Sequence, residues 1–186
     1  MVAEARDLGM ADQVIVKENL WNPQRIDAAS AALASAGGGF QFMPILADDA
    51  VHDAAFADEV DKVFAPRAIE LINWRNGAET LTASGGPLFS NHMRAEAARG
   101  DWHLWADTYA IVHKPGGFLA GGRGDELAVA AGLPREAWGF WVDRGATIIQ
   151  TDEPKAAIEW LAANGYRVPY TTDIRQAEPA HTASIN

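Results

Sequence analysis

Polar side chains that could bind a ligand or move a proton recur along this chain within or just after short apolar runs. The runs are rich in β-branched and other apolar residues, which predicts strands. The carboxyl ends of parallel strands share one face, where α/β proteins bind their ligands. We therefore expect these side chains to lie near one another. The candidate site residues are Lys17, Glu70, Trp105, Asp107, Gln150 and Asp152.

The acidic candidates indicate two kinds of chemistry. Glu70, Asp107 and Asp152 could act as acids and bases, or their oxygens could hold a divalent cation. Glu70 lies inside the apolar run AIELI at 68–72. A surface role is therefore disfavoured, and Glu70 is expected to pair with Lys17 or an arginine, or to bind a cation. No spacing among the acids identifies a particular reaction.

The other candidates have a structural interpretation beside the functional one. Lys17 could bind an anion or be a solvated lysine. Trp105 could belong to the core or stack on a polyol. Asp152 shortly precedes Pro154, a pattern typical of a helix start, so we expect Asp152 to cap the next helix and Gln150 to line the rim.

Two further features carry weaker signals. The glycine-rich segment 116–124 matches neither a Walker motif nor a dinucleotide fingerprint. We expect it to form a mobile loop over the carboxyl ends of the strands, with Arg123 as a phosphate contact. The spacing of four histidines does not support a metal site; they are His52, His92, His103 and His113.

Predicted strands and helices alternate along the chain. Strands are expected near 14–16, 40–46, 68–72, 103–109 and 147–149, and helices near 2–8, 22–36, 49–65, 89–98, 134–142 and 155–163. The strands are apolar on both faces, which is typical of a parallel sheet covered by helices. This periodicity leaves open whether the sheet is an open doubly wound one or a portion of a barrel.

Composition narrows the class of protein. The 186 residues suffice for one domain with a sizeable core. A net charge of −10 disfavours nucleic acid and anionic membranes as partners. The sequence has no cysteine and no apolar run of about 20 residues that could span a bilayer, and its first residues, which include acids, are not expected to form a signal peptide. We expect a soluble, cytoplasmic protein that binds a small molecule.

The segment WGFWVDRGATIIQTDEPKAAIEWLAANGY, at 138–166, resembles the last helix–strand–helix unit of the glycerophosphodiester phosphodiesterase family. In that family the last strand has the approximate pattern G-x-x-x-I-x-T-D-x-P. The segment LGMADQVIVKENL is similar to a mid-barrel strand entry, and HLWADTY resembles W-x-N-T with Asp107 in place of asparagine. The resemblance extends, with gaps, from about residue 2 to residue 170.

This resemblance implies the later part of a TIM (β/α)8 barrel that cleaves glycerol-phosphate diesters with a divalent cation, Mg²⁺ or Ca²⁺. It places Lys17 near the phosphate, Glu70 near the metal or polar floor, and Trp105 against the glycerol. The family's His-Arg pair, Glu-x-Asp metal ligands and second catalytic histidine have no counterpart here, so the catalytic residues and metal ligands stay unassigned. We expect one partial barrel domain over 1–170, a polar, disordered tail over 171–186, and a homodimer or a missing N-terminal half to complete the barrel.

Three functions are compatible with these features. The first is the C-terminal portion of such a phosphoric diester hydrolase, lacking the catalytic histidines. The second is a non-catalytic, self-associating half-barrel that binds a small polyol phosphate. The third is an unrelated α/β enzyme whose catalytic acids are Glu70, Asp107 and Asp152.

Overall fold

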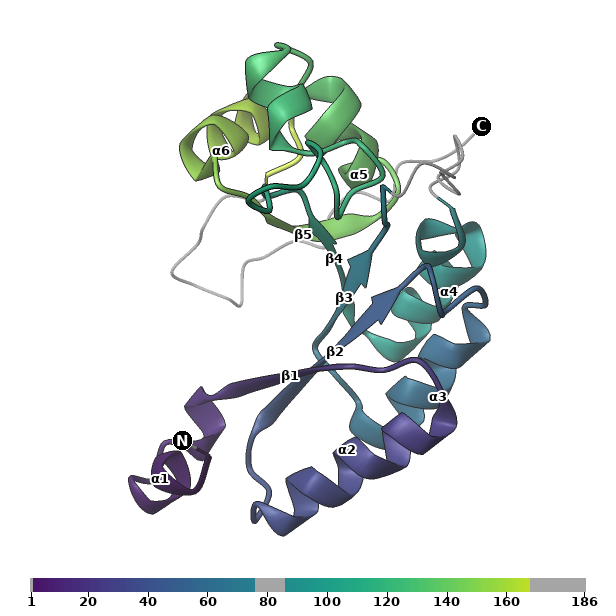
Figure 1. Cartoon of the computed structure of the whole chain (residues 1–186), viewed down its shortest axis with the longest axis vertical. Helices are drawn as coiled ribbons and strands as arrows, with labels where there is room; N and C mark the ends of the chain where they lie inside the picture. Colours follow the sequence, from purple (N-terminus) through teal and green to yellow (C-terminus); the bar gives the residue numbers. More distant parts are fainter. Residues whose placement is uncertain (1, 76–85, 168–186) are drawn as a thin grey trace.

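The computed structural model describes residues 2–75 and 86–167, and within them a five-stranded sheet runs through the middle of the molecule (Figure 1). Its strands are β1 (Ile15–Asn19), β2 (Gln41–Ala47), β3 (Ala68–Ile72), β4 (His103–Asp107) and β5 (Ala146–Gln150). All neighbours are parallel, and strand order follows the chain, β1-β2-β3-β4-β5. The predicted α/β class with a parallel sheet is confirmed.

Helices separate the strands. They are α1 (Val2–Asp7), α2 (Pro23–Ser35), α3 (Ala55–Phe64), α4 (Asn91–Gly100), α5 (Phe140–Val142) and α6 (Pro154–Ala163), with short 3-10 turns at Ala11–Gln13 and Pro87–Phe89. Two π-helical segments, Glu126–Ala130 and Arg135–Gly139, precede α5. The single helix predicted around Trp138 and Trp141 is thus a π-helical turn that continues into α5. The predicted tail at 171–186 lies outside the described residues.

Local sequence accounts for several of these boundaries. Asn22 caps α2, since its side-chain oxygen accepts a hydrogen bond from the Arg25 N–H at 2.9 Å, and Pro23 occupies the first turn. Ser90 caps α4 in the same way through the Met93 N–H. Cap residues with a short oxygen-bearing side chain therefore mark helix starts correctly at these two positions.

The register divides the sheet into two faces. Successive side chains along a strand point to opposite faces of the sheet. Lys17 pairs with Met43 on β2, and Glu70 pairs with Ile45 on β2 and with Trp105 on β4. These five side chains therefore point to the same face. Between β4 and β5 the register shifts by one residue, which inserts Thr147 as a bulge. Beyond this bulge, Ile148 and Gln150 join the same face as Trp105.

The opposite face carries the main hydrophobic core. Leu46, Ile69, Leu71, Leu104 and Ala106 from the strands pack with helical residues that include Ile26, Val60, Met93 and Trp141. A second cluster joins Ile149 to Trp138 and Ala157. Figure 1 shows α2, α3 and α4 on one side of the sheet. The described helices that pack on the sheet therefore cover the face opposite Lys17, Glu70 and Trp105.

The glycine-rich segment differs from the expectation of a mobile loop, because backbone hydrogen bonds tie it to the end of β3. The Asn73 N–H donates to Leu119 O at 3.0 Å, the Arg75 N–H donates to Phe118 O at 2.8 Å, and the Gly121 N–H donates to Asn73 O at 2.7 Å. Leu119 and Ala120 are buried. The segment is thus an integral wall at the carboxyl end of the sheet.

Candidate functional site

Five of the six predicted site residues share the sheet face that the helices leave free. Lys17, Glu70, Trp105, Asp107 and Gln150 occupy register positions of the same alternating set. Lys17 and Glu70 lie within their strands, and Asp107 and Gln150 are the last residues of theirs. The shared location at one face was expected from the sequence, and the parallel register produces it.

Lys17 and Glu70 form an ion pair between their Nζ and Oε2 atoms. The Glu70 side chain is only 5% exposed, whereas that of Lys17 is 35% exposed. The Lys17 ammonium also lies 5.1 Å from the ring centroid of Trp105, within the range of a cation–π contact. The interpretation of Lys17 as a merely solvated lysine is therefore wrong, and the expected pairing with Glu70 is confirmed.

Asp107 is the most perturbed acid of this face. It is 1% exposed, and no hydrogen bond of normal geometry joins its carboxylate oxygens to a described residue, although the Glu70 carboxyl and the Trp105 indole lie close enough to affect its pKa. Burial, followed by the negative charge of Glu70, raises the pKa of Asp107 to about 8, although the charge of Lys17 partly offsets this. Asp107 therefore holds a proton at neutral pH beside Glu70.

Tyr109 is a further polar residue near this pair that the sequence prediction missed. Burial raises the pKa of its phenol, and the charges of Asp107 and Glu70 add to that effect. The phenol consequently stays neutral and can donate a hydrogen bond at physiological pH. Its position two residues after Asp107, just beyond the end of β4, was the available signal.

Asp152 lies apart from the buried pair. Its carboxylate accepts a hydrogen bond from the Ala110 N–H at 3.1 Å, at the exposed rim after β5. The prediction that Asp152 caps α6 is wrong: the N-cap is Glu153, whose side chain makes no capping hydrogen bond, and the Thr151 hydroxyl accepts from the Glu153 N–H at 2.9 Å. Asp152 instead ties the ends of β4 and β5 together.

A buried carboxylate, Asp125, organises these strand ends and was not predicted. Its Oδ1 accepts from the Thr108 hydroxyl at 2.8 Å and from the Trp138 indole N–H at 2.9 Å. Its Oδ2 accepts from the Thr151 hydroxyl and the Asp152 N–H, both at 2.8 Å. With these four donors Asp125 is well satisfied, in contrast to Asp107, and its role is to hold the carboxyl ends of β4 and β5.

Arg123, the predicted phosphate contact, is engaged elsewhere. Its guanidinium pairs with Glu136 at 3.1 Å and lies 4.0 Å from the ring centroid of Phe140. Both partners belong to the helical segments after the glycine-rich wall. The structure therefore gives Arg123 a role in holding that wall, and Lys17 is the cation that the structure pairs with the carboxyls of the free face.

The carboxyl groups of this face are possible ligands for a divalent cation. Among the described residues no group of three or more His, Cys, Asp or Glu side chains converges on one point. Glu70 and Asp107 nevertheless provide neighbouring carboxyls, and both oxygens of Asp107 are buried without a hydrogen bond of normal geometry. Such a pair fits a cation like Mg²⁺, which is commonly held by one or two carboxylates together with water and substrate phosphate.

A cavity of about 280 Å³ opens at the carboxyl ends of β1, β2 and β3. It is lined by Asn19, Leu20, Trp21, Ile45, Ala47, Asp49, Ala50, Ile72 and Trp74. Asn19 follows Lys17 by two residues and Ile72 follows Glu70 by two, so the cavity adjoins the ion pair on the same sheet face. This is the end at which parallel α/β folds bind ligands.

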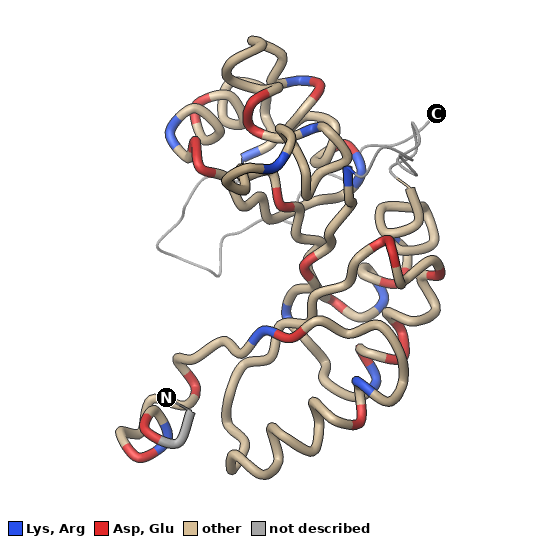
Figure 2. Tube along the Cα trace, viewed as in Figure 1, with Lys and Arg blue, Asp and Glu red and all other residues tan. Residues whose placement is uncertain are grey.

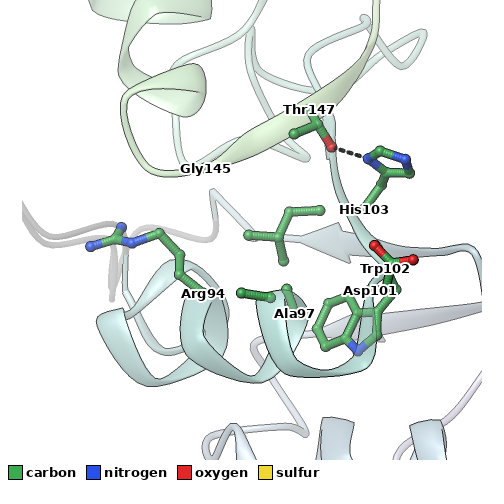
Figure 3. Close-up of a pocket in the computed structure, with 9 residues that line it drawn as sticks. Arg94, Ala97, Asp101, Trp102, His103, Gly145 and Thr147 are labelled. Carbon is green, nitrogen blue, oxygen red and sulfur yellow. Dashed lines mark hydrogen bonds between the residues drawn. The ribbon is translucent and has the colours of Figure 1, made fainter. Parts of the chain in front are cut away.

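A second cavity of similar volume lies at the amino ends of β4 and β5 (Figure 3). Three of its polar side chains are already engaged: Arg94 donates to Phe89 O at 2.9 Å, and His103 Nδ1 lies 2.8 Å from the Thr147 hydroxyl. In parallel α/β folds this end of the sheet serves stability rather than chemistry. The cavity at the carboxyl end is therefore the better candidate.

Charge is not segregated along the described chain. Figure 2 shows acidic and basic residues interspersed over the trace. The described part of the chain also contains no helix long and apolar enough to cross a membrane. Neither observation identifies a partner.

Comparison with known proteins gives a family for the chain. Residues 42–161 match DUF4996, a domain of unknown function. The protein belongs to the DUF4996 family. The match covers more than half of the chain and includes Glu70, Trp105 and Asp107, while Lys17 lies outside it. No curated protein matches this DUF4996 chain.

Proposed function

We propose that the free sheet face of this DUF4996 protein binds the phosphate of a glycerol-phosphate diester and belongs to a barrel-type phosphoric diester hydrolase. The observation that carries this proposal is the buried pair Glu70 and Asp107 beside Lys17. A cation can bind the phosphate, and two carboxyls can hold a metal or transfer protons, so this set of groups is suited to phosphodiester cleavage. The resemblance to glycerophosphodiester phosphodiesterases points to the same chemistry.

The topology supports a barrel origin for this site. Strand order that follows the chain, with the packed helices on one face, is the arrangement from which (β/α)8 barrels are built. Within the described sheet β1 pairs only with β2, and β5 only with β4, so both edges are free to extend it. A second copy of the chain or another barrel half would supply the further strands.

Charge balance connects the phosphate to a divalent cation. With Asp107 protonated, the charges of Lys17 and Glu70 cancel, so the cluster has no net positive charge to attract a phosphate. Glu70 and Asp107 would hold a cation such as Mg²⁺, which would supply positive charge for the phosphoryl oxygens. Lys17 would contact the phosphate directly, and Trp105 would form an apolar wall against the glycerol.

Calorimetry tests this proposal. We expect glycerol 3-phosphate to bind in the presence of Mg²⁺, about 10-fold more weakly to Lys17→Met, and unchanged to Lys62→Met, whose lysine pairs with Asp58 on α3. Mg²⁺ binding should release a proton because Asp107 is protonated at neutral pH, so the heat should depend on the buffer's ionisation enthalpy. Binding of glycerol 3-phosphate that depends on neither Mg²⁺ nor Lys17 would contradict the proposal.

The non-catalytic binding module is the second candidate. It is favoured because the described residues bring no histidine, and no third acid, into a cluster with Glu70 and Asp107. The hydrolase should cleave a glycerophosphodiester, whereas the binding module should only bind it. Mg²⁺-dependent hydrolysis of glycerophosphodiesters that is lost in Glu70→Gln supports the hydrolase, whereas saturable binding with no hydrolysis supports the binding module.

A further inference from the structure

The cavity at the carboxyl ends of β1, β2 and β3 is assembled from three consecutive strand-to-helix connections. The Leu20 N–H donates to Ile45 O at 3.0 Å, which holds the chain leaving β1 against β2. The Asp48 N–H donates to Ile72 O, and Asp48 Oδ1 accepts from the Trp74 N–H, both at 3.0 Å. These bonds fix the backbone that presents Trp21, Asp49 and Trp74 to the cavity.

Two tryptophans and two short polar side chains give this cavity a mixed lining. Trp21 is 46% exposed, and Asn19 and Asp49 are exposed, so a ligand from solvent can reach them. The Trp74 ring packs edge-on against Phe118, with centroids 5.2 Å apart, which restrains its orientation. Ile45 and Ile72 add apolar surface at the sheet.

We propose that this cavity is a subsite for a ring polyol or sugar, and that its ligand is the second alcohol of the phosphodiester that the free sheet face binds. Indole rings stack on the C–H faces of such rings, while carboxylate and amide groups hydrogen-bond their hydroxyls. A cationic head group fits less well, since Arg25 already lies 4.7 Å from the ring centroid of Trp21. This inference rests on the proposed function for the phosphate position.

The dimensions agree with one ring beside one phosphate. The cavity begins at the register level of Glu70, whose cross-strand partner Ile45 lines it, and Asn19 lies two residues, or about 7 Å along a parallel strand, beyond Lys17. A volume of about 280 Å³ equals that of roughly nine liquid water molecules. It accommodates a single ring with its hydroxyls and excludes a long acyl chain.

Nuclear magnetic resonance titration of the whole chain tests the subsite without phosphate. The probes are myo-inositol, glucose and choline, followed through the indole N–H signals. We expect saturable shifts at Trp21 and Trp74 with the polyols, weakened about 2- to 10-fold by Trp21→Ala or Asp49→Asn. Trp160→Phe, on α6, is the matched control and should bind like the wild type.

The outcomes separate this inference from the proposed function. Polyol binding that persists in Lys17→Met, while glycerol 3-phosphate binding is lost, supports both. If the polyols bind but glycerol 3-phosphate binds equally well to Lys17→Met and the wild type, the subsite is supported and the proposed function is rejected. The absence of shifts with either polyol, stronger binding of choline, or equal binding by Trp21→Ala and the wild type would overturn the subsite.

Discussion

Lys17 and Glu70 form their ion pair across an intervening strand. Lys17 lies on β1 and Glu70 on β3, while β2 runs between them and contributes Met43 and Ile45 to the same face. Adjacent strands are about 4.8 Å apart, so the pair spans roughly 10 Å of sheet, which the lysine and glutamate side chains cover together. The pair therefore depends on the order of three strands rather than on any local motif.

The first prediction concerns the electrostatic coupling of this face. Lys17→Met should raise the pKa of Asp107 further, because the lysine charge lowers it, and Glu70→Gln should lower that pKa by removing a neighbouring negative charge. Carbon-13 titration of the Asp107 carboxyl measures both shifts. Lys62→Met provides the control, and shifts of the same sign in the two site variants would contradict the assignment.

The second prediction concerns pH and stability. The pKa of Asp107 is about 8 in the folded chain and 3.8 as its ordinary value, so the folded state holds a proton that the unfolded state lacks between these pH values. The free energy of unfolding should therefore fall as pH rises through this window. Asp107→Asn removes this loss, so the stability of the variant relative to the wild type should increase by roughly 3–4 kcal/mol from pH 5 to pH 8.

Urea unfolding at pH 5, 6.5 and 8 measures this difference. Asp27→Asn, at an exposed position of α2, should show no such trend. A constant difference between Asp107→Asn and the wild type across the pH range would show that Asp107 ionises normally.

The third prediction concerns Asp125. Asp125→Ala leaves four donors around an emptied position, so it should lower the free energy of unfolding by about 3 kcal/mol. Thr151→Val removes only one of those donors and should cost about 1 kcal/mol. Chemical denaturation measures the free energy of unfolding of the two variants. A decrease of less than about 1 kcal/mol for Asp125→Ala would show that Asp125 does not hold the ends of β4 and β5 together.

The fourth prediction concerns the glycine-rich wall. Gly117 has φ +64°, and an added Cβ would lie 2.6 Å from the Gly122 carbonyl carbon and 2.7 Å from the Gly124 nitrogen. Gly132 has a similar φ of +69° but nothing within 4 Å. Gly132→Ala should therefore cost only the conformational strain of about 1 kcal/mol, and Gly117→Ala should cost at least about 3 kcal/mol. Thermal unfolding of both variants distinguishes these costs, and equal losses would contradict the close backbone contact.

Local patterns predicted the elements of the fold well. The run AIELI predicted a strand over 68–72, and β3 has those bounds. Asn22 and Pro23 marked the start of α2 correctly. These signals succeed because backbone preference and capping depend on residues a few positions apart.

Long-range contacts were harder to predict. Asp152 was expected to cap α6, yet its carboxylate bonds the backbone 42 residues earlier, at Ala110. Asp125 lies in a polar, glycine-rich stretch with no strand or helix signal, and its burial comes from Thr108, Trp138 and Thr151 around it. A polar residue that is buried by distant segments has the same local sequence as one in solvent.

The sequence by itself determined the alternation of strands and helices, the net charge, and the set of polar residues at strand ends, because these follow from composition and periodicity. Only the tertiary structure decided which of those residues meet. Pairing of β1, β2 and β3 in chain order brought Lys17 to Glu70, and burial raised the pKa of Asp107. Desolvation and charge–charge interaction depend on the whole arrangement of the chain, so they arise only once the strands have paired.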